Sequence, residues 1–110
     1  MSLELALSGV PLISCYKLDP LARLAQGLVT TWSALLPNLI AGKPIAPEFY
    51  DQYVRPENLA RQIEALFGDT HMRAWQKTGF AEVARLMATD RPSGEIAADA
   101  VLRIISNRQA

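Results

Sequence analysis

Residues 11–36 read PLISCYKLDPLARLAQGLVTTWSALL, and this stretch decides the fold that the sequence predicts. Residues 11–16 form a short apolar run with β-branched and aromatic members, which is typical of a buried strand. Asp19 can cap a helix that begins at Pro20, and leucines then recur at helical spacing. A second apolar run, residues 32–36, ends at a proline. The stretch therefore predicts a strand–helix–strand unit with parallel strands.

On the N-terminal side, residues 3–7 form a helix-like apolar pattern that Gly9 ends. On the other side, residues 38–47 contain a glycine and two prolines and predict an irregular loop. Residues 48–53 predict a short helical turn. This part of the chain therefore adds one helix before the unit and irregular backbone after it.

The remainder of the chain predicts three helices, which begin near Pro56, Asp69 and Ser93. Each has apolar residues at helical spacing on one face. Gly79 lies inside the second pattern and weakens it by about 1 kcal/mol of helix propensity relative to alanine. The sequence thus predicts an α/β unit followed by a helix-rich C-terminal part.

Composition narrows the class of protein. The chain has 110 residues, enough for one domain, and 50% of them are apolar, which excludes a disordered chain. Eleven basic residues balance eleven acidic ones. We expect no nucleic-acid partner and no polybasic membrane anchor, because both depend on a basic excess. One cysteine, Cys15, and one histidine, His71, are too few for a disulfide or a zinc site, so we expect neither metal nor cofactor.

The sequence contains no feature of an exported or membrane-spanning protein. Its N-terminus lacks the basic region, apolar core and cleavage site of a secretory signal. No apolar stretch approaches the roughly 18 residues that span a bilayer. With a single cysteine, the protein fits a reducing, cytoplasmic compartment.

The predicted sheet is unusually small. Two strands are too few for a stable parallel sheet, because such sheets normally have many strands and both faces covered. One interpretation is the C-terminal half of a larger doubly wound, Rossmann-like domain, so that residues 1–110 form a single partial domain. The other is a compact helical domain, since short apolar runs also occur in helices. Periodicity leaves both interpretations open.

Three blocks, taken together, resemble a known family. They are SLELALSGVP at 2–11, YK at 16–17 ahead of an Asp-Pro helix start, and LPNLIAGK at 36–43 with PE at 47–48. PENLA at 56–60 and AADAVL at 97–102 agree with them. The blocks resemble the C-terminal region of lipid-A-disaccharide synthase, an inverting glycosyltransferase of the two-Rossmann-domain type from Gram-negative bacteria. The resemblance covers essentially the whole chain.

The resemblance implies a UDP-sugar site in this region. Related enzymes hold the ribose hydroxyls with a glutamate at the position of Glu4, and a carboxylate can accept from two hydroxyls at once. A solvated surface glutamate is the plain alternative. Tyr16 and Lys17 follow a predicted strand end, where ligands of open α/β sheets bind. Tyr16 could instead be a partly buried core residue.

The block at 36–43 supplies the other candidate nucleotide-sugar-binding residues. The side-chain amide of Asn38 can both donate to and accept from a phosphate or sugar hydroxyl, although asparagines commonly cap their own turns. Ala41 and Gly42 would let the backbone approach the pyrophosphate closely. Lys43 could neutralise phosphate charge, where the family often has arginine. A solvated surface lysine is its alternative.

The sequence also departs from the family. The family has a glycine–threonine loop before the Ser-Leu-Glu triplet, where Met1 stands here, and an N-terminal domain with the acceptor-side groups. No catalytic residue is therefore expected in this chain. We expect a catalytically inactive piece of the glycosyltransferase with weak or absent UDP binding, and membrane contact only in the full-length parent. The alternative is an interaction module that forms homo-oligomers through open strand edges.

Overall fold

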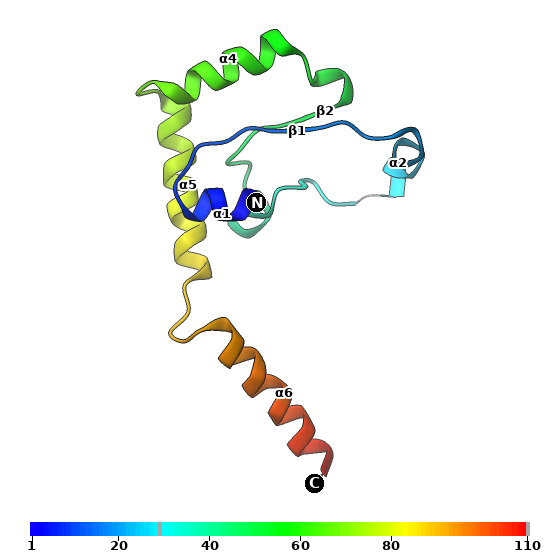
Figure 1. The fold of residues 1–110 in the computed structure, drawn as a ribbon, viewed down its shortest axis with the longest axis vertical. Helices are drawn as coiled ribbons and strands as arrows, with labels where there is room; N and C mark the ends of the chain where they lie inside the picture. The colour runs from blue at the N-terminus through cyan, green and yellow to red at the C-terminus, as the bar shows by residue number, and fades with distance from the viewer. Residues whose placement is uncertain (29, 110) are drawn as a thin grey trace.

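The computed structural model describes residues 1–28 and 30–109 and combines helices with one small sheet (Figure 1). The predicted α/β class with a helix-rich C-terminal part is confirmed. In chain order the elements are α1 (Ser2–Leu7), β1 (Ser14–Tyr16), α2 (Pro20–Ala25), the 3₁₀ turn η1 (Gln26–Leu28), α3 (Leu36–Ala41), β2 (Glu48–Tyr50), the 3₁₀ turn η2 (Asp51–Tyr53), α4 (Pro56–Phe67), α5 (His71–Met87) and α6 (Ser93–Gln109).

The sheet of the described residues has two strands, which run parallel as predicted. Ser14 lies opposite Glu48, and Tyr16 lies opposite Tyr50. The Ser14 N–H donates to the Pro47 carbonyl over 3.0 Å and extends the ladder at its amino end. Helices α2 and α3 lie in the connection, so the strand–helix–strand unit exists. Both strands end at the same edge of the sheet.

The prediction of the second strand at residues 32–36 is wrong. The strand is β2, and Leu36 begins α3 with a proline in the first helical turn, where proline is well tolerated. The irregular loop predicted at 38–47 is therefore helical as far as Ala41. The helical turn predicted at 48–53 is correct only for η2. The aromatic pair in β2 suits a strand, but a three-residue run carries too little periodicity to show it.

The helices predicted after Pro56 are all present. The helix predicted to begin near Asp69 is α5, which Thr70 caps, because the Thr70 hydroxyl accepts from the Arg73 N–H over 3.2 Å. Helix α5 continues through Gly79 despite its low propensity. A Cβ at that position would lie 2.7 Å from side-chain carbons of Ile45. Glycine is thus needed there so that the loop before β2 can approach the helix.

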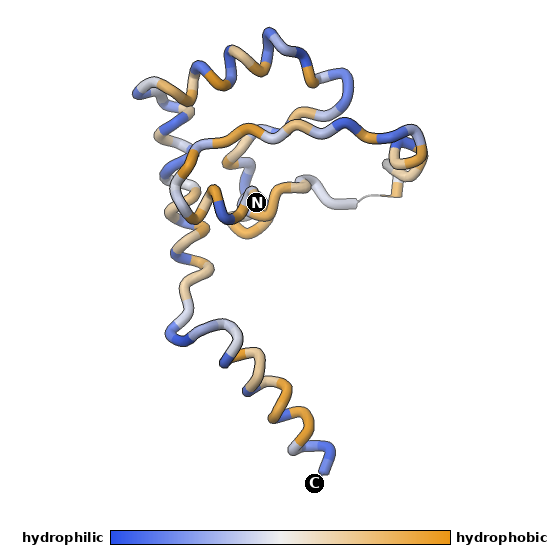
Figure 2. The backbone as a smooth tube through the Cα atoms, viewed as in Figure 1, coloured by the Kyte–Doolittle hydropathy of each residue, from blue (hydrophilic) through white to orange (hydrophobic). Residues whose placement is uncertain are grey.

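The core lies where α1 and α3 pack against α5. Its buried members share small or branched apolar side chains, apart from one phenylalanine: Ala6, Leu35, Ile45, Ala46, Phe80 and Val83. Helix α6 leads away from this core, and the structure measures 63 × 39 × 19 Å (Figure 1). Figure 2 shows apolar residues along α6 and at the α2 tip, both far from the core.

Candidate functional site

The carboxyl end of the sheet is formed by two stacked aromatic rings. The rings of Tyr16 and Tyr50 lie with their centroids 5.4 Å apart and their planes 18° from parallel. The Tyr50 hydroxyl donates to Oε1 of Glu48 over 2.7 Å. Burial, followed by this bond to the carboxylate, raises the pKa of Tyr50 to about 12. Tyr50 is therefore a neutral donor at physiological pH, and it supports one face of Tyr16.

Glu48 is the main polar centre of the site, and sequence reasoning missed its role. Besides the Tyr50 hydroxyl, its carboxylate accepts from the Ser33 hydroxyl over 2.5 Å and from the Ala34 N–H over 2.9 Å. Nδ2 of Asn38 lies 3.3 Å from Oε2. Burial raises the pKa of Glu48, but these four donors outweigh it and hold the pKa below its ordinary value. The charged carboxylate thus joins β2 to the segment that enters α3.

Asn38 is fully buried, and its side-chain amide bonds within the chain. Its Oδ1 accepts from the N–H groups of Ile45 and Ala46 over 2.9 and 3.0 Å. Its Nδ2 donates to the Ala46 carbonyl over 2.9 Å. An amide offers two donors and one oxygen with two lone pairs, and these contacts use both lone pairs. In this geometry Asn38 holds the loop before β2.

The residues after Asn38 close α3. Gly42 has φ +66°, a left-handed conformation that suits glycine, and its N–H donates to Leu39 O over 3.3 Å. The Lys43 N–H donates to Asn38 O over 3.2 Å, and its Nζ lies 5.4 Å from the Trp75 ring centroid. The Lys43 charge therefore lies against α5 in a cation–π contact. Ala41 is half-buried at the end of the helix.

Glu4 lies on α1 with an exposed side chain. Its Oε2 is 2.8 Å from the amino group of Met1, and a hydrogen bond from that group lowers the pKa of Glu4. A hollow of about 430 Å³ lies between α1 and β1 and brings Ser2 and Leu5 close to Tyr16. Glu4 does not line it. The structure thus brings α1 and Tyr16 together without joining Glu4 to Asn38.

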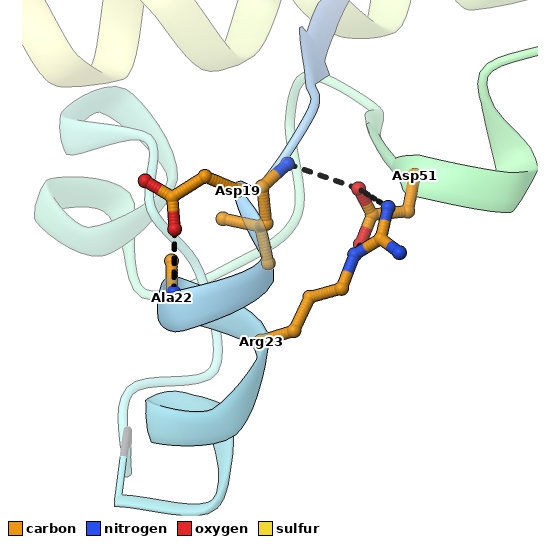
Figure 3. Close-up of polar contacts among 5 residues, drawn as sticks. Asp19, Ala22, Arg23 and Asp51 are labelled. Carbon is orange, nitrogen blue, oxygen red and sulfur yellow. Dashed lines mark hydrogen bonds and ion pairs between the residues drawn. The ribbon is translucent and has the colours of Figure 1, made fainter.

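A polar clasp, formed by the Leu18 N–H and the side chains of Arg23 and Asp51, holds the backbone just beyond the ends of both strands (Figure 3). The Leu18 N–H donates to Oδ1 of Asp51 over 2.9 Å, and Arg23 Nε lies 3.1 Å from Oδ2. These two bonds, with smaller contributions from the charges of Arg23 and Lys17, lower the pKa of Asp51. Asp51 has φ +43°, which few residues other than glycine adopt. Lys17 is exposed, and it lies close enough to Asp51 for its positive charge to act on the carboxylate.

Other side chains lie apart from this site. Cys15 is exposed at the middle of β1. His71 is exposed at the start of α5, and Phe80 is a core residue. Residues 1–28 and 30–109 contain no group of three His, Cys, Asp or Glu that could hold a metal ion. Within the same ranges, no helix is long and apolar enough to cross a membrane.

Comparison with known proteins adds the family context. The family model described as lipid-A-disaccharide synthetase matches residues 1–100. The chain is 39% identical over 104 residues to a lipid-A-disaccharide synthase of Nitrobacter hamburgensis, covering 93% of this chain and 26% of the relative. It is 35% identical to the synthase of a Rhodopseudomonas palustris strain, covering 96% and 27%, and 36% identical to that of Hydrogenovibrio crunogenus, covering 93% and 27%. The chain therefore spans about a quarter of the length of these relatives. No solved structure gives a significant match.

Proposed function

This chain belongs to the lipid-A-disaccharide synthetase family, and we propose that it forms part of the donor-binding half of an inverting glycosyltransferase with a Rossmann-like domain. The reaction proposed for the whole enzyme joins a UDP-activated, diacylated glucosamine to an acylated glucosamine 1-phosphate and releases UDP. The parallel pairing of β1 and β2 is the observation that carries this proposal. It brings Tyr16, Lys17 and Asp51 to one edge, and ligands of open α/β sheets bind at the carboxyl ends of the strands.

The residues at this edge have distinct proposed roles. Tyr16 offers an aromatic face to the nucleotide, with Tyr50 stacked behind it. The exposed ammonium group of Lys17 neutralises part of the diphosphate charge, which grows as the leaving group departs. Glu4 remains accessible on α1 and can accept from two ribose hydroxyls. The clasp at Asp51 fixes the backbone that presents Lys17.

In this proposal the block at 36–43 serves mainly to hold the backbone next to the site in place. Because both lone pairs of the Asn38 oxygen accept from the backbone, we assign Asn38 to holding the loop that carries Ile45. Ligand contacts of Ala41, Gly42 and Lys43 stay predictions, since the Gly42 and Lys43 N–H groups cap α3. A diphosphate would have to draw Lys43 away from Trp75.

The isolated chain is expected to be inactive. Transfer needs a base that activates the acceptor hydroxyl, and the residues at this edge supply only part of the leaving-group stabilisation. The pure 110-residue chain should therefore show no turnover and at most weak UDP binding. Disaccharide formation by the pure chain would contradict this expectation.

A graft tests the proposed role in an active context. We would exchange the matching quarter of the Nitrobacter hamburgensis synthase for this chain and measure disaccharide formation. Activity should survive the exchange, and Lys17→Ala should raise the KM for the UDP-sugar. Lys77→Ala, an exposed lysine on α5, is the matched control and should leave KM unchanged. An active graft in which both variants behave alike would refute the assignment of Lys17.

A second candidate function is homo-oligomerisation, and a specific observation favours it. Helix α6 leads away from the core with exposed apolar side chains, of which Leu102 and Ile104 are each 60% exposed. The outer edges of β1 and β2 also face no further strand in the described chain. Sedimentation velocity over a wide concentration range tests this candidate. A strictly monomeric chain at high micromolar concentration would exclude it.

A further inference from the structure

A hollow lies at the amino end of β1, away from the candidate site. Residues 9–13, which lead into β1, form one side of it, and the second half of α4 with the start of α5 forms the other. In Figure 1 the junction of α4 and α5 lies at one end of the sheet and α2 at the other. The volume of the hollow is about 420 Å³, which falls in the range of roughly 300–1,000 Å³ that is typical of small-molecule sites.

The walls of this hollow are mostly apolar. The side chains that form them are branched aliphatic or aromatic: Val10, Leu12, Ile13, Ile63, Leu66 and Phe67. Leu66 is buried, whereas Val10 and Ile63 are 44% and 42% exposed and Phe67 is 82% exposed. The exposed members leave apolar surface open to water, and a ligand that covers this surface gains from its burial.

One cation lines the same hollow. Arg73, on the first turn of α5, is half-buried, and its Nη1 donates to the Leu66 carbonyl over 2.6 Å. This bond holds the guanidinium at the end of α4 and uses one of its five N–H donors. In the part of the chain that the structure describes, Arg73 forms no ion pair with a carboxylate. Its charge is therefore complementary to an anionic group placed in the hollow.

We propose that this hollow binds a small apolar monocarboxylate. The carboxylate lies on the guanidinium of Arg73, whose planar fork matches its two oxygens, and the hydrocarbon body lies against residues 10–13 and α4. Arg73 is the one charged side chain among the described residues of the lining, so a single negative charge suits the hollow better than a diphosphate. The assignment does not depend on the glycosyltransferase role, which concerns the opposite end of the strands.

Nuclear magnetic resonance of the ¹⁵N-labelled 110-residue chain tests the proposal, with octanoate as the probe. Octanoate should produce saturable chemical-shift changes at residues 9–13, at 63–67 and at Arg73, with a dissociation constant on the order of 1 mM. The comparison ligands are 1-octanol and octylammonium, which have the same hydrocarbon chain without a negative charge. Both should bind roughly tenfold more weakly or worse, because neither forms a charge-assisted bond with the guanidinium.

Three variants separate the charge of Arg73 from its place in the fold. Arg73→Gln should weaken octanoate binding by roughly tenfold and bring it near that of 1-octanol, whereas Arg73→Lys should keep the preference for the anion. Phe67→Ser should weaken binding several-fold without moving the urea midpoint, because Phe67 is 82% exposed. Arg103→Gln, at an exposed arginine of α6, is the matched control and should bind octanoate like the unmodified chain.

The proposal is overturned if octanoate causes no saturable shifts, if the shifts lie on α2 or α6 instead, or if 1-octanol binds as tightly as octanoate. It is equally overturned if Arg73→Gln binds like the unmodified chain, or if Arg103→Gln weakens binding as much as Arg73→Gln does. If Arg73→Gln does not fold, Phe67→Ser decides the matter: a several-fold loss of affinity supports the proposal, and an unchanged affinity overturns it.

Discussion

Replacing Asn38 with alanine should destabilise the fold strongly, because one buried amide satisfies three backbone groups. The substitution leaves the N–H groups of Ile45 and Ala46 and the Ala46 carbonyl without their partner. Both residues are 2% exposed, so water cannot readily replace it. An unsatisfied buried group costs about 1–3 kcal/mol, and partial relaxation of the loop gives an expected loss of about 3–5 kcal/mol. That is a large share of the roughly 5–15 kcal/mol that stabilises a typical domain.

Urea unfolding followed by circular dichroism measures this loss, with the free energy of unfolding extrapolated to water. Asn107→Ala on α6 is the matched control, since that side chain is exposed and its loss should change stability by less than about 0.5 kcal/mol. Asn38→Asp keeps the acceptor but sets a second carboxylate beside Glu48, so it should be more harmful at pH 7 than at pH 4. A loss below about 1 kcal/mol for Asn38→Ala would refute the role of Asn38 in holding the loop.

Three further predictions concern neighbouring groups. The folded-state pKa of Glu48 lies below its unfolded value, so its stabilisation is complete above the unfolded value near 4.5 and disappears as the pH falls through the lowered pKa. Melting temperatures between pH 3 and 7 should show this slope, and Glu48→Gln should flatten it. Gly79→Ala should lower the free energy of unfolding by up to about 2 kcal/mol, because overpacking against Ile45 exceeds the gain of about 1 kcal/mol in helix propensity. In a chain that already carries Ile45→Ala, the same substitution should instead raise the free energy of unfolding, as urea unfolding would show. In an ultraviolet titration Tyr50 should ionise near pH 12, and Glu48→Gln, which removes the charge beside its hydroxyl, should lower this midpoint; an unchanged midpoint would contradict the role of Glu48.

The long helices could be predicted because each carries its own evidence. Helices α4, α5 and α6 have apolar residues at helical spacing, and local residues mark where they begin. Gly79 is the instructive exception. Propensity counts against a helix there, and the compensating contact with Ile45 lies 34 positions away in the sequence.

The second strand could not be predicted, because what selects it is not local. Residues 32–36 are more apolar than β2, yet β2 pairs with β1. The carboxylate of Glu48 anchors the start of β2 to Ser33 and Ala34, at the entrance to α3. A glutamate in a three-residue strand gives no local evidence of this arrangement.

Only part of the candidate site could be predicted, because some of its contacts are likewise not local in the sequence. Tyr16 and Lys17 were identified because they follow a strand that the sequence does indicate, and both lie at the carboxyl edge of the sheet. Asn38 was identified as polar and well placed, but its partners, Ile45 and Ala46, follow seven and eight positions later, after a turn. Glu48 was part of a recognised block, and its role depends on four donors that only the fold assembles.

The two exposed apolar helices differ in length and in attachment. Helix α2 has six residues and is joined to the end of β2 by the ion pair of Arg23 with Asp51, and its leucines are exposed. Helix α6 has 17 residues, about 25 Å of length, and leads away from the core, so a long protein surface can be laid along it. A long exposed apolar face can pair with the same face of a second copy, whereas α2 offers only a short one. Serine substitutions for Leu102 and Ile104 on α6 should therefore reduce self-association, and serine substitutions for Leu21 and Leu24 on α2 should leave it intact, as sedimentation velocity would show.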